Sequence, residues 1–185
     1  MALPDPSQTY REDKAGSGPA SGLYEAQIGK ALGIKPPAIW PLVVSALHEF
    51  GIDSLNVQIA AAATCQVECG FRPIAERRAD PRKQPSLYHA QERYWPWHGR
   101  GLIQLTWERN YRAAGKALGI DLISDPDKAL EPETSARVLA WFFDVNGVAD
   151  AADARDWELV RRRVNGGLNA WPEFKRCVQR LLEVV

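Results

Sequence analysis

Apolar residues recur three and four positions apart over most of the chain, which is the period of an α-helix. Several of these stretches end at a glycine, the residue best suited to close a helix in the left-handed conformation. The pattern predicts helices within residues 24–33, 36–51, 54–70, 106–119, 132–147 and 156–167, followed by one more after Trp171. No alternating strand pattern of useful length appears. The sequence therefore predicts a mainly α-helical fold.

Two segments lack the helical period. Residues 1–22 are rich in proline, glycine, serine and charge, which predicts a flexible or irregular N-terminal arm. Residues 77–96 are polar and contain prolines, and here a short hairpin is the compatible regular structure. Residues 23–185 are expected to form a single catalytic domain, because this length can bury a core without disulfides or metals.

Charge and cysteine usage narrow the class of protein. Lys plus Arg and Asp plus Glu each number 23, so the formal net charge of zero predicts no general attraction to nucleic acid or to acidic membranes. Three cysteines do not form a disulfide framework. The first residues lack a basic start followed by an apolar run, and no later run is long enough to span a membrane. We expect a soluble protein made in a cytoplasm.

Two glutamates stand out as candidate chemistry. Glu68 lies in the last turn of a predicted helix, just before Gly70, where the helix dipole and apolar neighbours disfavour a charged carboxylate. Glu76 precedes Arg77 and Arg78, which favour the charged form. Opposed environments of this kind suit an acid and a base in glycoside hydrolysis. A helix-end glutamate and a solvated Glu-Arg cluster remain the structural alternative.

The stretches QVECGFRPIAE, residues 66–76, and GRGLIQLTWERNY, residues 99–111, resemble the signatures of glycoside hydrolase family 19. This family contains chitinases and related bacteriophage endolysins. The resemblance extends over roughly residues 36–172. It implies a lysozyme-like helical fold with a long substrate groove, Glu68 as the general acid and Glu76 as the base that activates water.

The resemblance also implies further site residues. Thr106 takes the place of a hydroxyl that holds the attacking water. Substrate contact is implied for Arg100, Gln104, Asn110, Tyr111 and Asn165. Amides, hydroxyls and aromatic faces are suited to acetamido sugars. Structural alternatives exist, because Thr106 also fits a helix N-cap, Asn110 a polar helix position and Arg100 an ion pair with a buried carboxylate.

The chain departs from the family pattern at three points. Val67 replaces a histidine, the connection between Glu68 and Glu76 is one residue shorter than usual, and Phe174 stands where an arginine is common. The short connection bears on the role of Glu76, because it could re-aim that side chain. Arg176 is a candidate substitute for the missing arginine.

Other residues carry weaker signals. Cys65 and Cys69 share a helix face, but no histidine spacing completes a metal site, so two core-packing thiols are favoured and no metal or cofactor is expected. Trp95, Trp97 and Tyr94 suit either a sugar-stacking rim or the core, and an exposed loop position is expected for His98. The arginines at 161–163 are expected on a solvated helix face.

Together these features predict a monomeric glycosidase that hydrolyses β-1,4 bonds between N-acetylated amino sugars with inversion. The expected substrate is bacterial peptidoglycan, and the expected site of action is the cell wall after release from the producing cell. Three alternatives stay open: a chitinase, a single-glutamate lysozyme or lytic transglycosylase, and a non-catalytic cell-wall-binding module.

Overall fold

The computed structural model describes residues 22–185, so the predicted arm lies outside the described residues apart from Gly22. The helices are α1 (Glu25–Leu32), α2 (Trp40–Glu49), α3 (Leu55–Cys69), α4 (Pro85–Glu92), α5 (Glu108–Leu118), α6 (Pro132–Val145), α7 (Val148–Asp153), α8 (Trp157–Asn165) and α9 (Trp171–Leu182), with a 3-10 helix η1 (Pro126–Leu130) before α6. Two short strands, β1 (Ile74–Ala75) and β2 (Arg100–Gly101), pair antiparallel. The prediction of a mainly α fold is confirmed.

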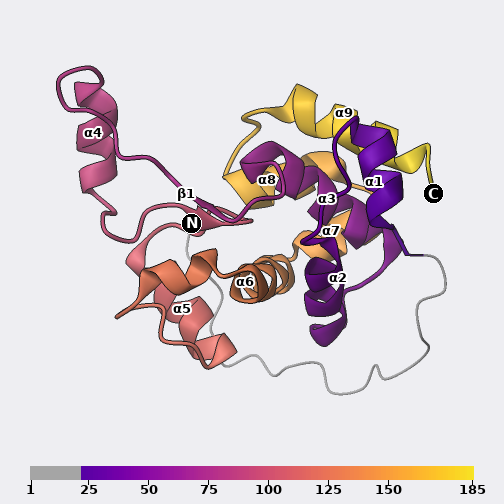
Figure 1. The fold of residues 1–185 in the computed structure, drawn as a ribbon, viewed down its shortest axis with the longest axis horizontal. Coiled ribbons are helices and arrows are strands. Elements are labelled where there is room, and N and C mark those ends of the chain that lie inside the picture. The colour runs from indigo at the N-terminus through magenta and orange to yellow at the C-terminus, as the bar shows by residue number, and fades with distance from the viewer. Residues whose placement is uncertain (1–21) are drawn as a thin grey trace.

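Helix α3 forms the centre of the core. It lies between α2, α7, α8 and α9 (Figure 1). Ten of its 15 residues are buried, and the run Ala60–Ala63 is fully enclosed. Small side chains let the surrounding helices approach, and a helix that is apolar on all sides belongs in an interior. Ser54 caps its start by accepting from the Val57 amide at 3.2 Å, and Gly70 closes its end at φ 58°.

The first described residues are fixed to this core by hydrogen bonds. The Leu23 amide donates to Gln58 Oε1 at 2.9 Å, and the indole of Trp40 donates to the Leu23 carbonyl at 2.6 Å. Both Leu23 and Trp40 are buried. The described chain is therefore held to the core from Leu23, the point where the helical period begins in the sequence.

Helix α4 replaces the hairpin that the sequence allowed between residues 77 and 96. It stands apart from the other helices at one end of the molecule (Figure 1). Gln91 is its only fully buried residue, and its apolar Leu87 is 45% exposed. Because the helix has no apolar face, periodicity could not predict it. The pair of strands forms instead outside this segment, between Ile74–Ala75 and Arg100–Gly101.

Within residues 22–185, every helix is too short or too polar to cross a lipid bilayer.

Candidate active site

Glu68 emerges from the last turn of α3 and meets a buried arginine from α8. Its Oε1 accepts from Arg161 Nη1 at 2.5 Å, and the two side chains are 16% and 2% exposed. Arg161 also donates from Nε to the Asn169 carbonyl at 2.7 Å. The expectation that this arginine lies on a solvated face is wrong. Its guanidinium instead bonds both to Glu68, the candidate acid, and to Asn169, just before α9.

Glu76 lies directly after β1 and is held by neutral donors. Its Oε1 accepts from Gln91 Nε2 at 2.8 Å and from the Tyr94 hydroxyl at 2.9 Å. Its Oε2 accepts from the Gly99 amide at 3.2 Å. Burial and then the bond to Glu76 raise the pKa of Tyr94 to about 12, so the hydroxyl remains a donor at neutral pH. The carboxyl group is thus fixed by three bonds.

The surroundings of the two glutamates differ from those expected. From neighbours in the sequence, we expected arginines beside Glu76 and apolar residues beside Glu68. In the structure, the guanidinium of Arg161 lies at Glu68. Arg78 turns away from Glu76 to pair with Glu92. The contact that supplies Arg161 spans 93 residues of sequence, and such a contact cannot be inferred from chain neighbours. The structure thus reverses the expected surroundings: the charged partner lies at Glu68, the candidate acid, and neutral donors surround Glu76.

The loop at residues 98–106 is tightly packed at both of its glycines, and at Gly101 it requires glycine. A Cβ on Gly99 would lie 2.8 Å from Gln104 Oε1, and a Cβ on Gly101 would lie 2.6 Å from Ser135 Oγ. Gly101 also has φ 77°, which side chains rarely adopt. The G-R-G pattern therefore allows this loop to pack closely against β1 and α6.

Arg100 and Tyr111 are enclosed by the protein. Their exposures are 6% and 0%. Arg100 donates to Asp127 Oδ1 at 2.7 Å and to the Tyr111 hydroxyl at 3.1 Å, and Tyr111 donates to the His98 carbonyl at 2.7 Å. Burial is the main cause that raises the pKa of Tyr111 to about 12. Both side chains make structural hydrogen bonds, and the implied substrate contacts stay predictions. The carboxylate partner of Arg100 is exposed rather than buried.

Thr106 and Gln104 lie beside Glu76. The position that a Cβ would take on Gly99 is 3.4 Å from Thr106 Oγ1 and 3.5 Å from Glu76 Cβ. The Thr106 hydroxyl donates to the Gln104 carbonyl at 2.8 Å. Helix α5 starts after Trp107, so Thr106 is not its N-cap. Gln104 donates from Nε2 to the Ile74 carbonyl at 2.9 Å, which ties this loop to β1.

Asn110 and Asn165 each retain an unused acceptor. Their Oδ1 atoms are buried and have no hydrogen-bond partner, while Asn110 Nδ2 donates to the Thr106 carbonyl at 2.7 Å. Asn165 ends α8, the helix that also carries Arg161. Buried polar atoms without partners are uncommon and invite a ligand or a water molecule as explanation. Both acceptors therefore remain candidates for contact with sugar.

The aromatic residues divide between packing and exposure. Trp95 stacks on His98 with ring centroids 3.8 Å apart, and His98 is 7% exposed, so the expectation of an exposed histidine is wrong. Burial, followed by the charge of Arg100, lowers the pKa of His98. Trp107 is 38% exposed and meets Tyr94 edge-on at 5.2 Å. Among these aromatics, Trp107 is the one that sequence reasoning did not consider.

The cysteines behave as core residues. All three are free thiols and buried. Burial raises the pKa of Cys65 and raises that of Cys69 to about 11, so neither forms a thiolate at neutral pH. In the part of the chain from residue 22 onward, no group of three or more His, Cys, Asp or Glu side chains is arranged to hold a metal ion.

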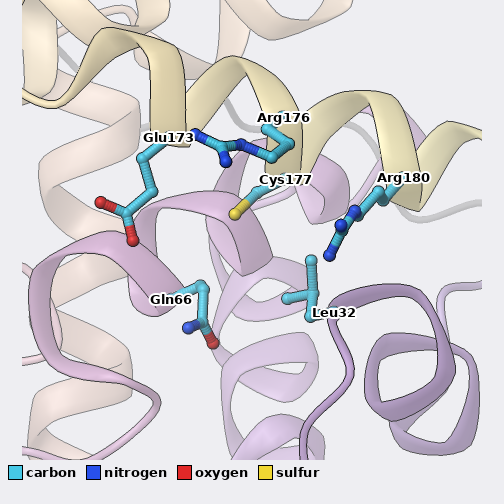
Figure 2. A pocket seen from close by; sticks show the side chains of 6 residues that line it. All are labelled: Leu32, Gln66, Glu173, Arg176, Cys177 and Arg180. Carbon is cyan, nitrogen blue, oxygen red and sulfur yellow. The ribbon is translucent and has the colours of Figure 1, made fainter.

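Arg176 does not substitute for an arginine at Glu68. It lines a hollow of about 260 Å³ between α9, α3 and α1, together with Glu173, Cys177 and Arg180 (Figure 2). Phe174 is fully buried, and its ring lies 5.9 Å from the guanidinium carbon of Arg161. The arginine beside the candidate acid therefore comes from α8 rather than from α9.

A helical domain that presents two fixed glutamates, one at the end of its central helix and one at a small β-pair, has the form of a lysozyme-like glycoside hydrolase. The family model for glycoside hydrolase family 19, described as chitinase class I, matches residues 57–153. The chain belongs to this family. The match includes Glu68, Glu76 and the loop before α5 but ends before Arg161 and Asn165.

Curated relatives and solved structures agree with this assignment. The chain is 30% identical over 165 residues to endochitinase At2g43610 of Arabidopsis thaliana, covering 83% of this chain and 52% of that protein. It is 40% identical over 83 residues to a glycosyl hydrolase family 19 domain-containing protein of Haemophilus influenzae, covering 45% and 38%. The chain thus spans about half or less of these relatives. Chitinase C from Streptomyces griseus HUT6037 superposes with a TM-score of 0.63 at 25% identity, covering 89% of this chain and 95% of that one.

Proposed function

We propose that this protein hydrolyses β-1,4 bonds between N-acetylated amino sugars, with peptidoglycan as its substrate and inversion at the anomeric carbon. The observation that carries the proposal is the fixed pair Glu68 and Glu76 in a chain of family 19. Each carboxyl group is held by partners from another part of the chain, Glu68 by Arg161 and Glu76 by Gln91 and Tyr94. Positioned carboxyl groups on two separate elements suit a reaction that needs both an acid and a base.

In the proposed reaction, Glu68 gives a proton to the glycosidic oxygen as the bond to the anomeric carbon breaks. Glu76 removes a proton from a water molecule that attacks this carbon from the opposite face. The Thr106 hydroxyl uses its hydrogen on the Gln104 carbonyl, so its lone pairs can accept a hydrogen bond from that water. Inversion follows because attack and departure occur on opposite faces.

The substrate is held by amide groups. The unpartnered Oδ1 atoms of Asn110 and Asn165 can accept from sugar hydroxyls or from acetamido N–H groups. Gln104 borders the same loop with both of its donor bonds made to carbonyl oxygens, so its Oε1 is available as an acceptor. N-acetylated sugars carry hydroxyl and amide N–H groups, which can donate to these three acceptor oxygens.

Chitin is the second candidate substrate, favoured by relatives that are named as chitinases, such as the Arabidopsis endochitinase. Peptidoglycan is preferred because the segment that holds Glu76 is rich in exposed arginine and lysine, whereas chitin is uncharged. Three free, buried cysteines also accord with a protein that does not depend on disulfides.

Mass spectrometry of peptidoglycan digested with wild-type protein and with Glu68→Gln tests the proposal. Glutamine keeps the shape and still accepts from Arg161 but has no acidic proton, so the rate should fall by at least ~10²-fold. Wild-type products should carry ordinary reducing ends, and proton NMR spectra recorded during the reaction should show them released as the α-anomer. Products with 1,6-anhydro ends would instead identify a lytic transglycosylase, and intact strands would identify a binding module or an enzyme confined to chitin.

A further inference from the structure

Residues 77–95 form a charged excursion beside the candidate base, here called the basic lobe. The chain leaves at Glu76 and returns at Gly99, where the Glu76 amide donates to the Gly99 carbonyl at 2.7 Å. Helix α4 lies within it and projects from the body of the molecule (Figure 1). The lobe contains five basic and two acidic residues, a formal charge of +3 on a chain whose net charge is zero. Positive charge is therefore concentrated at one end of the molecule.

Most of this charge is not neutralised by carboxylates of residues 22–185. Four exposed cations in the lobe have no carboxylate partner among the described residues 22–185: Arg77, Arg82, Lys83 and Arg93. Of the two lobe acids, Glu92 pairs with Arg78, and Asp80 accepts from the Arg82 backbone amide. The four cations remain available to an external anion.

The lobe is fixed relative to Glu76. Arg78 lies over the rings of Tyr88 and Trp95, at 5.0 and 4.6 Å from their centroids. Gln91 is 1% exposed, accepts from the Ala79 amide at 2.7 Å and donates to Glu76. These contacts connect α4, the loop before it and the candidate base. The four cations are thus carried by a lobe whose base is held against Glu76.

We propose that the basic lobe binds the stem-peptide carboxylates of the peptidoglycan strand that is being cleaved. This inference rests on the proposed function. Stem peptides are attached to alternate sugars of the strand, so their carboxylates necessarily accompany the sugars that lie between Glu68 and Glu76. Guanidinium groups bind carboxylates in paired, charge-assisted hydrogen bonds. A chitin strand offers no such groups, so the lobe discriminates between the two glycans. Wall teichoic acid is the rival anion, but it is not attached at every cleavage site.

The test compares two triple variants, each with three charges reversed, on two forms of one substrate. The lobe variant is Arg82→Glu with Lys83→Glu and Arg93→Glu, and the control is Lys35→Glu with Lys116→Glu and Lys175→Glu. All six side chains are exposed, and both variants change the net charge equally. The substrate is soluble peptidoglycan from a Gram-negative wall, which has no teichoic acid, used intact or after an amidase has removed its stem peptides. The measurement is kcat/KM from released reducing ends.

At low ionic strength the lobe variant should lose at least about fivefold in kcat/KM on intact strands, since each exposed charge contact contributes modestly. The loss should shrink as salt rises. On peptide-free strands both variants should match the wild type within about twofold. Equal rates of lobe variant and wild type on intact strands would overturn the inference, as would an equal loss on both substrates. Melting curves establish that each variant is folded, and Arg82→Gln with Lys83→Gln provides a milder second variant.

Co-sedimentation with insoluble walls separates this inference from the proposed function, because it requires no cleavage. Wild-type protein should be retained more strongly by intact walls than by amidase-treated walls, and the lobe variant should lose this preference. If the wild type cleaves nothing but shows the preference, the catalytic proposal fails and the lobe inference stands. If retention survives removal of the peptides, or depends on walls that contain teichoic acid, the partner is a different anion and the inference is wrong.

Discussion

Arg161 shows how one residue can decide the surroundings of a catalytic candidate. It is buried and pairs with Glu68, whereas its neighbour Arg162 is 53% exposed and pairs with Glu158 on its own helix. Removing one partner of a buried pair leaves the other charge uncompensated, which is strongly destabilising. An exposed pair four residues apart along a helix contributes little.

We therefore predict that Arg161→Met lowers the free energy of unfolding by about 1–3 kcal/mol, a range reduced from fully buried pairs because Glu68 is partly exposed. Arg162→Met is the matched control and should cost less than about 0.5 kcal/mol. Urea denaturation of the two variants measures both. Similar values for the two would show that Arg161 is not a buried partner of Glu68.

Trp107 combines exposure with an unusual backbone. Its φ of 78° and ψ of 135° lie in a region that only glycine occupies without strain. Strain of this kind is often found at functional sites, and the exposed ring meets Tyr94, which bonds to Glu76.

For Trp107 we predict that the glycine variant is more stable than the alanine variant by about 1 kcal/mol, the reverse of the usual order, because only glycine relieves the backbone. Both variants should raise KM for the glycan if the ring stacks on sugar. Melting curves and steady-state kinetics measure the two effects. An alanine variant as stable as the glycine variant would contradict the first, and an unchanged KM the second.

At the scale of elements, α4 positions the candidate base, although its own residues are nearly all exposed. Tyr94, just beyond the helix, donates to Glu76 Oε1, whereas the ring of Tyr88 within the helix contacts Arg78 and His89. A hydrogen bond to a charged group such as the Glu76 carboxylate contributes about 1.5–3 kcal/mol.

Tyr94→Phe should therefore reduce kcat by about 10- to 150-fold and leave KM nearly unchanged, because the bond orients the base rather than the sugar. Tyr88→Phe, in the same lobe, is the control and should retain the wild-type kcat. Initial rates over a range of substrate concentrations separate the two constants. A change in KM alone would place Tyr94 in substrate binding instead.

The sequence could predict the longer helices that bury an apolar face. It could not predict α7, whose six residues are too few to show a period, or α4, which has almost no buried face. Residues 54–70 carry an apolar face with a serine cap and a closing glycine, and α3 appears within one residue at each end. Residues 85–92 bury only Gln91, so they gave no periodic signal. The site divides in the same way. Glu68, Glu76 and the glycine-rich loop belong to local motifs, whereas the partner of Glu68 comes from 93 residues away.

At the scale of the whole molecule, the first described residues are bonded directly to the core. Leu23 and Trp40 are bonded to each other, and Leu23 is bonded to Gln58 in α3. We predict that deleting residues 1–21 lowers the melting temperature by less than about 4 °C, which corresponds to roughly 1–2 kcal/mol for a domain of this size. Calorimetry of the full and shortened chains measures it. A drop of more than about 8 °C would show that the deleted residues stabilise the fold.

The backbone hydrogen bond between Glu76 and Gly99 brings the two ends of the basic lobe together, so the lobe is an insertion whose ends are adjacent. An insertion of this kind can be lengthened, shortened or exchanged while β1, β2 and α3 keep their positions. Substrate preference can therefore diversify among relatives independently of the reaction itself. A transplanted lobe has to keep only the equivalents of Gln91 and Tyr94, through which it reaches the base.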